Sequence, residues 1–112
     1  MSVILVVDDD APTREALATG LKKLGHEIHL AGTGVAALDE VRRHPVDLAI
    51  IDLKLPDMEG TELFGALRIL RPEAIAIMIS GAATVDEAVS ALKRGIYDFI
   101  TKDFRSLASM TI

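Results

Sequence analysis

The middle of the chain reads VDLAIID over residues 46–52, and the turn-forming stretch LKLPDMEG (53–60) follows it directly. A nearly unbroken apolar run that stops at a turn is typical of a strand buried on both faces of a parallel sheet. Asp52 then lies at the carboxyl end of this strand. In open parallel sheets the ligand crevice lies outside the carboxyl ends, so we expect the chemistry of the chain to gather around Asp52.

Four more strands and four helices are predicted around this stretch. The other apolar or alternating runs cover residues 3–7, 26–31, 74–79 and 96–101. Between the runs, apolar residues recur at helical spacing in residues 12–24, 35–44, 63–71 and 84–94. Strands that alternate with helices favour parallel pairing with right-handed crossovers. The fold class is therefore predicted to be α/β: a doubly wound five-stranded parallel sheet, flavodoxin-like with strand order 2-1-3-4-5, and with a short or absent fifth helix.

Length and composition narrow the range of functions. Half of the 112 residues are hydrophobic, which predicts one domain over 1–112, with 103–112 as a displaced or truncated last helix. A net charge of -5 gives no electrostatic reason for direct binding to nucleic acid or to an anionic membrane. Cysteine is absent, and the apolar runs are too short to span a membrane. We expect a cytoplasmic protein, with His26, His29 and His44 as unrelated surface residues.

Polar side chains follow four of the predicted strands. They are Asp8 and Asp9 after the first strand, Asp52 after the third, Ser80 after the fourth and Lys102 after the fifth. Strands one and three are neighbours in the predicted order, so the three carboxylates should share one pocket. Such a cluster repels itself, and oxygen donors without histidine or cysteine select a hard cation, Mg²⁺ first. Its predicted ligands are Asp8 (directly or through water), Asp9, Asp52 and the backbone carbonyl of Lys54.

This arrangement predicts phosphoryl transfer onto a carboxylate. Asp52 would be the nucleophile, and Lys102 and Ser80 would contact the phosphoryl oxygens that the metal does not. Lysine suits this role because it binds phosphate as a point charge. Taken singly, each residue has an ordinary explanation: Asp8 to Asp10 could cap a helix, and the others could be turn or surface residues.

Several short motifs together resemble the receiver domain of two-component response regulators. They are VVDD (6–9), ID (51–52) with LPDMEG (55–60), SGA (80–82) and FITK (99–102). The resemblance covers residues 3 to about 104, and in detail it is nearest to receivers of the nitrogen-regulatory and sporulation phosphorelay type. It implies a Mg²⁺-dependent switch with the following roles: Asp52 as phosphoacceptor, Asp8 and Asp9 as metal ligands, Ser80 as switch hydroxyl, Phe99 as switch aromatic and Lys102 as phosphate contact.

The resemblance also implies partners. The phosphoryl donor would be a phosphohistidine of a histidine kinase or phosphotransfer protein, and an output domain or effector protein would detect the change. The receiver would catalyse at most its own phosphorylation and dephosphorylation. Asp103 follows Lys102 where receivers usually have proline, so we predict a trans peptide there. The few residues after Lys102 would leave one face of the sheet partly bare, which predicts a displaced terminal segment, a compensating contact such as a homodimer, or a truncated chain.

Other functions can be weighed against the same residues. A flavin or nucleotide binder would need glycines or hydroxyls after the first strand, where this chain has Asp8-Asp9-Asp10. A phosphatase of the haloacid-dehalogenase type would need threonine where Pro12 stands, and Thr13 comes one residue later. Two alternatives stay open: a receiver-like interaction module that does not use phosphate, and the N-terminal receiver cut from a transcriptional regulator.

Overall fold

Five parallel strands form one sheet in the structure, a computed structural model that describes residues 1–102. Strands and helices alternate along the chain in the order β1 (Val3–Val7), α1 (Ala11–Lys23), β2 (Glu27–Ala31), α2 (Gly34–Arg43), β3 (Leu48–Asp52), α3 (Gly60–Leu70), β4 (Ile75–Ser80), α4 (Val85–Lys93) and β5 (Asp98–Thr101). The strand order is β2-β1-β3-β4-β5, with every neighbouring pair parallel. The predicted fold class and strand order are confirmed. The predicted fifth helix and the peptide bond before Asp103 lie outside the described residues.

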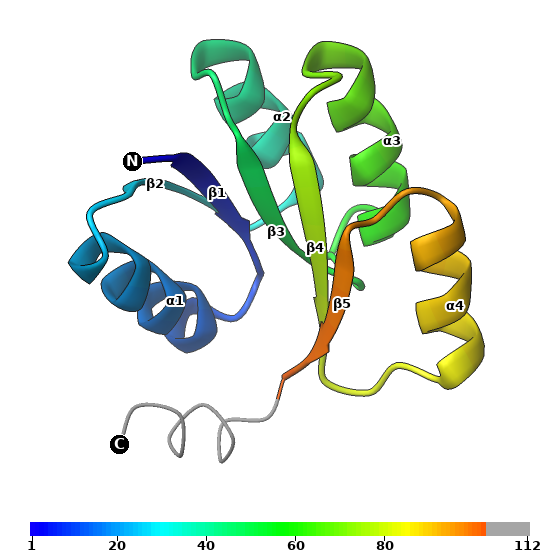
Figure 1. Cartoon of the computed structure of the whole chain (residues 1–112). Coiled ribbons are helices and arrows are strands. Elements are labelled where there is room, and N and C mark those ends of the chain that lie inside the picture. The colour runs from blue at the N-terminus through cyan, green and yellow to red at the C-terminus, as the bar shows by residue number, and fades with distance from the viewer. Residues whose placement is uncertain (103–112) are drawn as a thin grey trace.

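The helices cover the two faces of the sheet unequally (Figure 1). α1 lies on one face, and α2, α3 and α4 lie on the other. Alternate residues of β1 show the division, because Leu5 and Val7 pack into the larger core cluster with residues of α2, α3 and α4. Ile4 and Val6 point the other way and pack with Leu17 of α1. β1 is therefore buried from both sides, as its unbroken apolar run predicts.

The helices begin where the sequence marks their starts. Asp10 is the N-cap of α1, and Pro12 lies in its first turn, where a missing backbone N–H costs nothing. At the start of α4, Thr84 and Glu87 form the predicted capping box, in which each side chain accepts a hydrogen bond from the other residue's backbone N–H. Across the described residues, no helix combines the length and the apolar character needed to cross a membrane.

Candidate functional site

The carboxyl ends of β1 and β3 place two aspartates side by side. The strands pair in register with Val7 opposite Ile51, so Asp8 and Asp52 come next on adjacent strands. Asp8 is completely buried and Asp52 is 7% exposed. The backbone N–H of Asp8 donates to the Ala31 carbonyl at 3.1 Å, which continues the strand pattern up to the carboxylate. The structure thus brings the Asp8 and Asp52 carboxylates together at one end of the sheet, as predicted.

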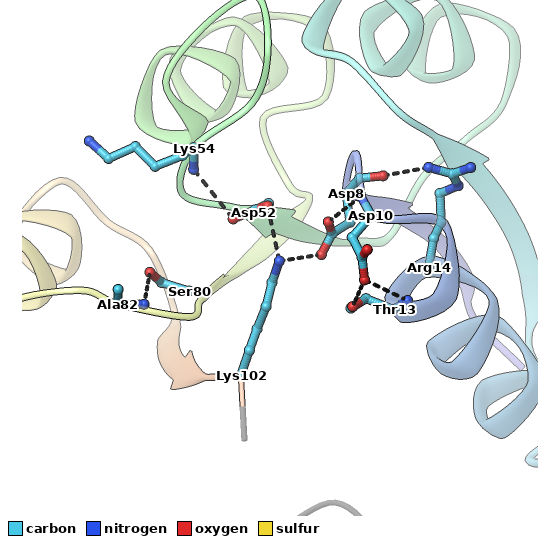
Figure 2. Close-up of polar contacts among 9 residues, drawn as sticks. All are labelled: Asp8, Asp10, Thr13, Arg14, Asp52, Lys54, Ser80, Ala82 and Lys102. Carbon is cyan, nitrogen blue, oxygen red and sulfur yellow. Dashed lines mark hydrogen bonds and ion pairs between the residues drawn. The ribbon is translucent and has the colours of Figure 1, made fainter. Parts of the chain in front are cut away.

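Lys102 reaches the same two carboxylates from beyond β5. Its Nζ lies 2.7 Å from Asp8 Oδ2 and 3.0 Å from Asp52 Oδ2 (Figure 2). The backbone N–H of Lys102 donates to the Ser80 carbonyl at 2.6 Å, which fixes the start of the side chain beside β4. One ammonium group therefore bridges two buried carboxylates that would otherwise repel each other. We call Asp8, Asp9, Asp52 and Lys102 the acidic pocket.

The three consecutive aspartates after β1, Asp8, Asp9 and Asp10, have different surroundings. Asp10 caps α1, since its carboxylate accepts the Thr13 N–H at 3.1 Å and also bonds the Thr13 hydroxyl. The hydroxyl bond holds the pKa of Asp10 below its usual value. The backbone N–H of Asp10 in turn donates to Asp8 Oδ1 at 2.9 Å, which orients the Asp8 carboxylate. The capping explanation thus applies to Asp10, while Asp8 faces the pocket and Asp9 is exposed beside it.

The pocket's donors fit a hard divalent cation. Asp8, Asp9 and Asp52 each offer one carboxylate oxygen, and these oxygens lie within 4.8 Å of one another. Asp8 Oδ2 is buried and has no hydrogen-bond geometry to any described group, so its contact with Lys102 is an ion pair alone. A cation bound here would give this buried oxygen a ligand bond that its ion pair with Lys102 does not replace. All three donors are oxygens, which matches Mg²⁺ or Ca²⁺ rather than zinc or copper.

Burial and neighbouring charges act in opposite directions on the pocket's titrating groups. Burial raises the pKa of the Asp52 carboxyl, the hydrogen bond from Lys102 lowers it, and the Asp8 charge raises it again, so that the pKa stays above its usual value. Burial lowers the pKa of Lys102, but the contacts with Asp8 and Asp52 outweigh that effect and raise it. Lys102 is therefore an ammonium at neutral pH, and it stabilises the ionised form of Asp52.

Two further predicted residues lie next to Asp52. Ser80 is the last residue of β4 and is 5% exposed; it was expected just after that strand. Its neighbour Ile79 pairs with Asp52 across the sheet, so Ser80 lies one step beyond the carboxylate. The Ser80 Oγ accepts the Ala82 N–H at 3.2 Å. The backbone N–H of Lys54 lies 3.3 Å from Asp52 Oδ1, while the Lys54 side chain points away from the pocket (Figure 2).

Phe99 lies apart from the pocket. It pairs with Met78 between β4 and β5, and its partly buried side chain packs against the larger core cluster. The ring therefore contacts the core on the face of the sheet that α2, α3 and α4 cover. Its part in a switch stays a prediction.

Sequence reasoning missed two residues that shape the pocket's surroundings. The Arg14 Nη1 donates to the Asp8 carbonyl at 2.7 Å, which ties α1 to the end of β1. Asp57, within the motif LPDMEG, accepts the N–H groups of Gly34 and Val35 at 2.8 and 2.9 Å, and these bonds hold its pKa below the usual value. Neither contact could be predicted from the spacing of residues in the sequence. Each joins two segments whose separation depends on how a helix packs against the sheet.

Comparison with known proteins agrees with this geometry. The family model described as "Response regulator receiver domain" matches residues 4–110. The transcriptional regulatory protein KdpE of Mycobacterium tuberculosis is 36% identical over 104 residues, which are 93% of this chain. Those residues are 46% of KdpE, so the chain spans less than half the length of that relative.

Two solved structures have the same architecture. A CheY-like receiver domain protein from Methanospirillum hungatei superimposes with a TM-score of 0.86 at 34% identity, covering 99% of this chain and 90% of that one. A response regulator from Burkholderia pseudomallei, solved with a phosphorylated aspartic acid, a calcium ion and citrate, has a TM-score of 0.85 at 27% identity and covers 97% and 65%. With its family motifs, its sheet order and its pocket all in agreement, the chain belongs to the response regulator receiver domain family.

Proposed function

We propose that Asp52 is the phosphoacceptor of this receiver and that the acidic pocket carries out the transfer. The observation that carries the proposal is the position of the Lys102 Nζ, 3.0 Å from Asp52 and 2.7 Å from Asp8, at the carboxyl ends of the central strands. A buried carboxylate kept beside an ammonium is poised for nucleophilic attack, because the ammonium keeps it ionised while burial keeps it poorly solvated.

The reaction would proceed by in-line displacement. An Asp52 oxygen forms a bond to phosphorus while the bond from phosphorus to the donor nitrogen breaks, and the electron pair returns to that nitrogen, which takes up a proton. Lys102 would then move its contact from the carboxylate to a phosphoryl oxygen. Residues Asp8, Asp9 and Asp52 with the Lys54 carbonyl would hold Mg²⁺, which when bound supplies positive charge to the phosphoryl oxygens. Attack of water on the acyl phosphate would reverse the modification.

The switch would be read through Ser80 and Phe99. In the present structure the Ser80 Oγ accepts the Ala82 N–H, and a phosphoryl group on Asp52 would offer this hydroxyl a strong acceptor instead. Turning towards it would move the loop between β4 and α4. Phe99 packs against the core and pairs with Met78 of β4, the strand that precedes this loop. Its ring could therefore follow the movement and change the surface of α4 and β5.

The partners are part of the same proposal. A phosphohistidine on a histidine kinase or phosphotransfer protein would be the donor, and an output domain or effector would be the reader. The match to KdpE favours the receiver of a transcriptional regulator. One domain over residues 1–112, a homodimer and a cytoplasmic location stay predictions.

Acetyl phosphate with Mg²⁺ tests the proposal directly. The wild-type chain should gain the mass of one phosphoryl group, and Asp52→Asn should gain none, because an amide cannot form the acyl phosphate. Asp86→Asn removes an exposed carboxylate on α4 and should behave as wild type. No mass gain in the wild type would favour the interaction module that does not use phosphate. An unchanged gain in Asp52→Asn would assign the phosphate to another residue.

A further inference from the structure

A second group of metal-binding side chains lies between β2 and α2. His29 is on β2, His44 directly follows α2 as its C-cap, and Glu27 and Glu40 lie beside them. Glu27 pairs with Val3 at the start of β1, whereas Asp8 follows the end of that strand. This group therefore lies towards the amino-terminal ends of the strands, and the acidic pocket lies at their carboxyl ends. We propose that these residues, the histidine cluster, form a binding site for Zn²⁺.

Three ligand atoms already converge. Glu27, His29 and His44 each offer one atom, and these atoms lie within 4.8 Å of one another. The Glu27 Oε2 is 2.7 Å from the His29 Nε2. Ligand atoms about 2.0–2.1 Å from a tetrahedral zinc are roughly 3.3 Å apart, so the contact between Glu27 and His29 must widen slightly when the ion binds. A water molecule would take the fourth position.

Glu40 is placed to orient both imidazole rings. Its Oε2 lies 3.6 Å from the His29 Nδ1 and 3.4 Å from the His44 Nε2. Each ring therefore turns one nitrogen towards Glu40, which leaves the His29 Nε2 and the His44 Nδ1 as metal ligands. Histidine ligands usually donate their second N–H to a carboxylate in this way. Arg43 does not remove Glu40 from this role, because its Nη2 is closer to Asp39, at 2.7 Å, than to Glu40, at 3.3 Å.

The two rings are stacked, with centroids 3.7 Å apart and planes inclined by 21°. A bound metal lies in the plane of each ligating ring, so binding must tilt the rings away from this stack. Both side chains reach the surface, with His29 19% and His44 34% exposed. The site opens to solvent, which gives a metal ion direct access.

The donor set determines which cation binds. Two imidazoles and one carboxylate favour Zn²⁺ and its neighbours among the transition metals over Mg²⁺, which prefers oxygen ligands alone. The molecule would thus hold two cation sites of different chemistry: oxygen donors in the acidic pocket and mainly nitrogen donors in the histidine cluster. This difference allows the two sites to be measured separately.

Competition between the full chain and a chromophoric zinc chelator, in excess Mg²⁺, tests the site. We expect one Zn²⁺ per chain, with affinity at least about tenfold weaker in His29→Gln and in His44→Gln. Glu40→Gln should weaken binding about tenfold, as loss of an orienting carboxylate does. His26→Gln is the matched control, because this imidazole lies outside the cluster and accepts the Ser2 N–H; its affinity should equal wild type.

The imidazole resonances of His29 and His44 in NMR spectra give an independent readout. Zn²⁺ should shift both, Mg²⁺ neither, and the resonances of His26 should stay unchanged. The proposal would be overturned by wild-type protein that binds no zinc, or by equal affinity in His44→Gln and wild type with both folded by circular dichroism. Loss of zinc binding in Asp9→Asn with Asp52→Asn would also overturn it, by placing the ion in the acidic pocket.

Discussion

Carboxylates lie beside nitrogen bases both in the acidic pocket and in the histidine cluster, but their exposure differs. The side chains of Asp8 and Asp52 are 0% and 10% exposed, whereas those of Glu27 and Glu40 are 48% and 21% exposed. Buried charges cost folding free energy unless well paired, while exposed ion pairs contribute little in either direction. A pocket that brings two buried carboxylates together is therefore built for chemistry and not for stability. The histidine cluster should be nearly neutral to folding until a metal binds.

Removing the ammonium from the acidic pocket should produce the largest effect. Lys102→Met leaves the buried carboxylates of Asp8 and Asp52 without a countercharge, so we expect the free energy of unfolding in metal-free buffer to fall by about 2–3 kcal/mol. Urea denaturation in the presence of a chelator measures this change. Added Mg²⁺ should recover part of it, because the cation replaces the missing positive charge.

A matched control for this variant is Lys93→Met, which removes an exposed lysine at the end of α4. Its unfolding free energy should stay within about 0.5 kcal/mol of wild type. Equal stability of the two variants would mean that the carboxylates of the acidic pocket tolerate each other without Lys102. The contrast with the histidine cluster would then be lost.

The backbone next to the acidic pocket is tightly packed at Gly60, the first residue of α3. A Cβ on Gly60 would stand 2.4 Å from the backbone oxygen of Asp52 and 2.9 Å from the Met78 sulfur. Gly60→Ala must therefore push the end of β3 aside, and we expect the unfolding free energy to fall by about 2 kcal/mol. Gly65→Ala, in the same helix with nothing within 4 Å, should stabilise by about 0.5–1 kcal/mol. A Gly60→Ala variant as stable as wild type would refute the tight packing behind Asp52.

The acidic pocket could be predicted from the sequence because a parallel sheet brings strand ends together whatever the loops do. Asp8 and Asp52 follow directly from the strand order. The histidine cluster could not be predicted, since His29 and His44 meet only because His29 faces α2 and α2 ends where it does. A shift of β2 by one residue would turn His29 to the opposite face. Arg14 was missed for the same reason, because its reach depends on how α1 docks.

Strand boundaries show the same limit on a smaller scale. The predicted first strand matches β1 residue for residue, whereas the predicted last strand, 96–101, begins two residues before β5 (Asp98–Thr101). Ile96 extended the apolar run because it is a core residue, 3% exposed, that lies before the strand. Burial and strand pairing produce the same apolar pattern, and only the backbone pairing separates them.

Replacing the phosphoacceptor itself should have a smaller effect, of opposite sign. Burial raises the pKa of Asp52 in the folded state, so the folded chain holds this proton more tightly than the unfolded chain does. Ionised Asp52 therefore costs stability above its folded pKa, and that cost disappears as the pH falls below the unfolded value. Asp52→Asn should raise the unfolding free energy at neutral pH without metal by about 1 kcal/mol. The gain should shrink on acidification, and denaturation at a series of pH values, with Asp86→Asn as control, measures it.

The smallest change is expected in the histidine cluster. Without metal, the double variant His29→Gln with His44→Gln should unfold within about 0.5 kcal/mol of wild type, because partly exposed contacts to Glu27 and Glu40 contribute little. Urea denaturation in a chelator gives the comparison with Asp52→Asn under the same conditions. A loss above about 1 kcal/mol would mean that the stacked rings hold β2 to α2 by themselves. The cluster would then be a structural element of the fold, and its exposed charges would matter to folding as much as the buried ones do.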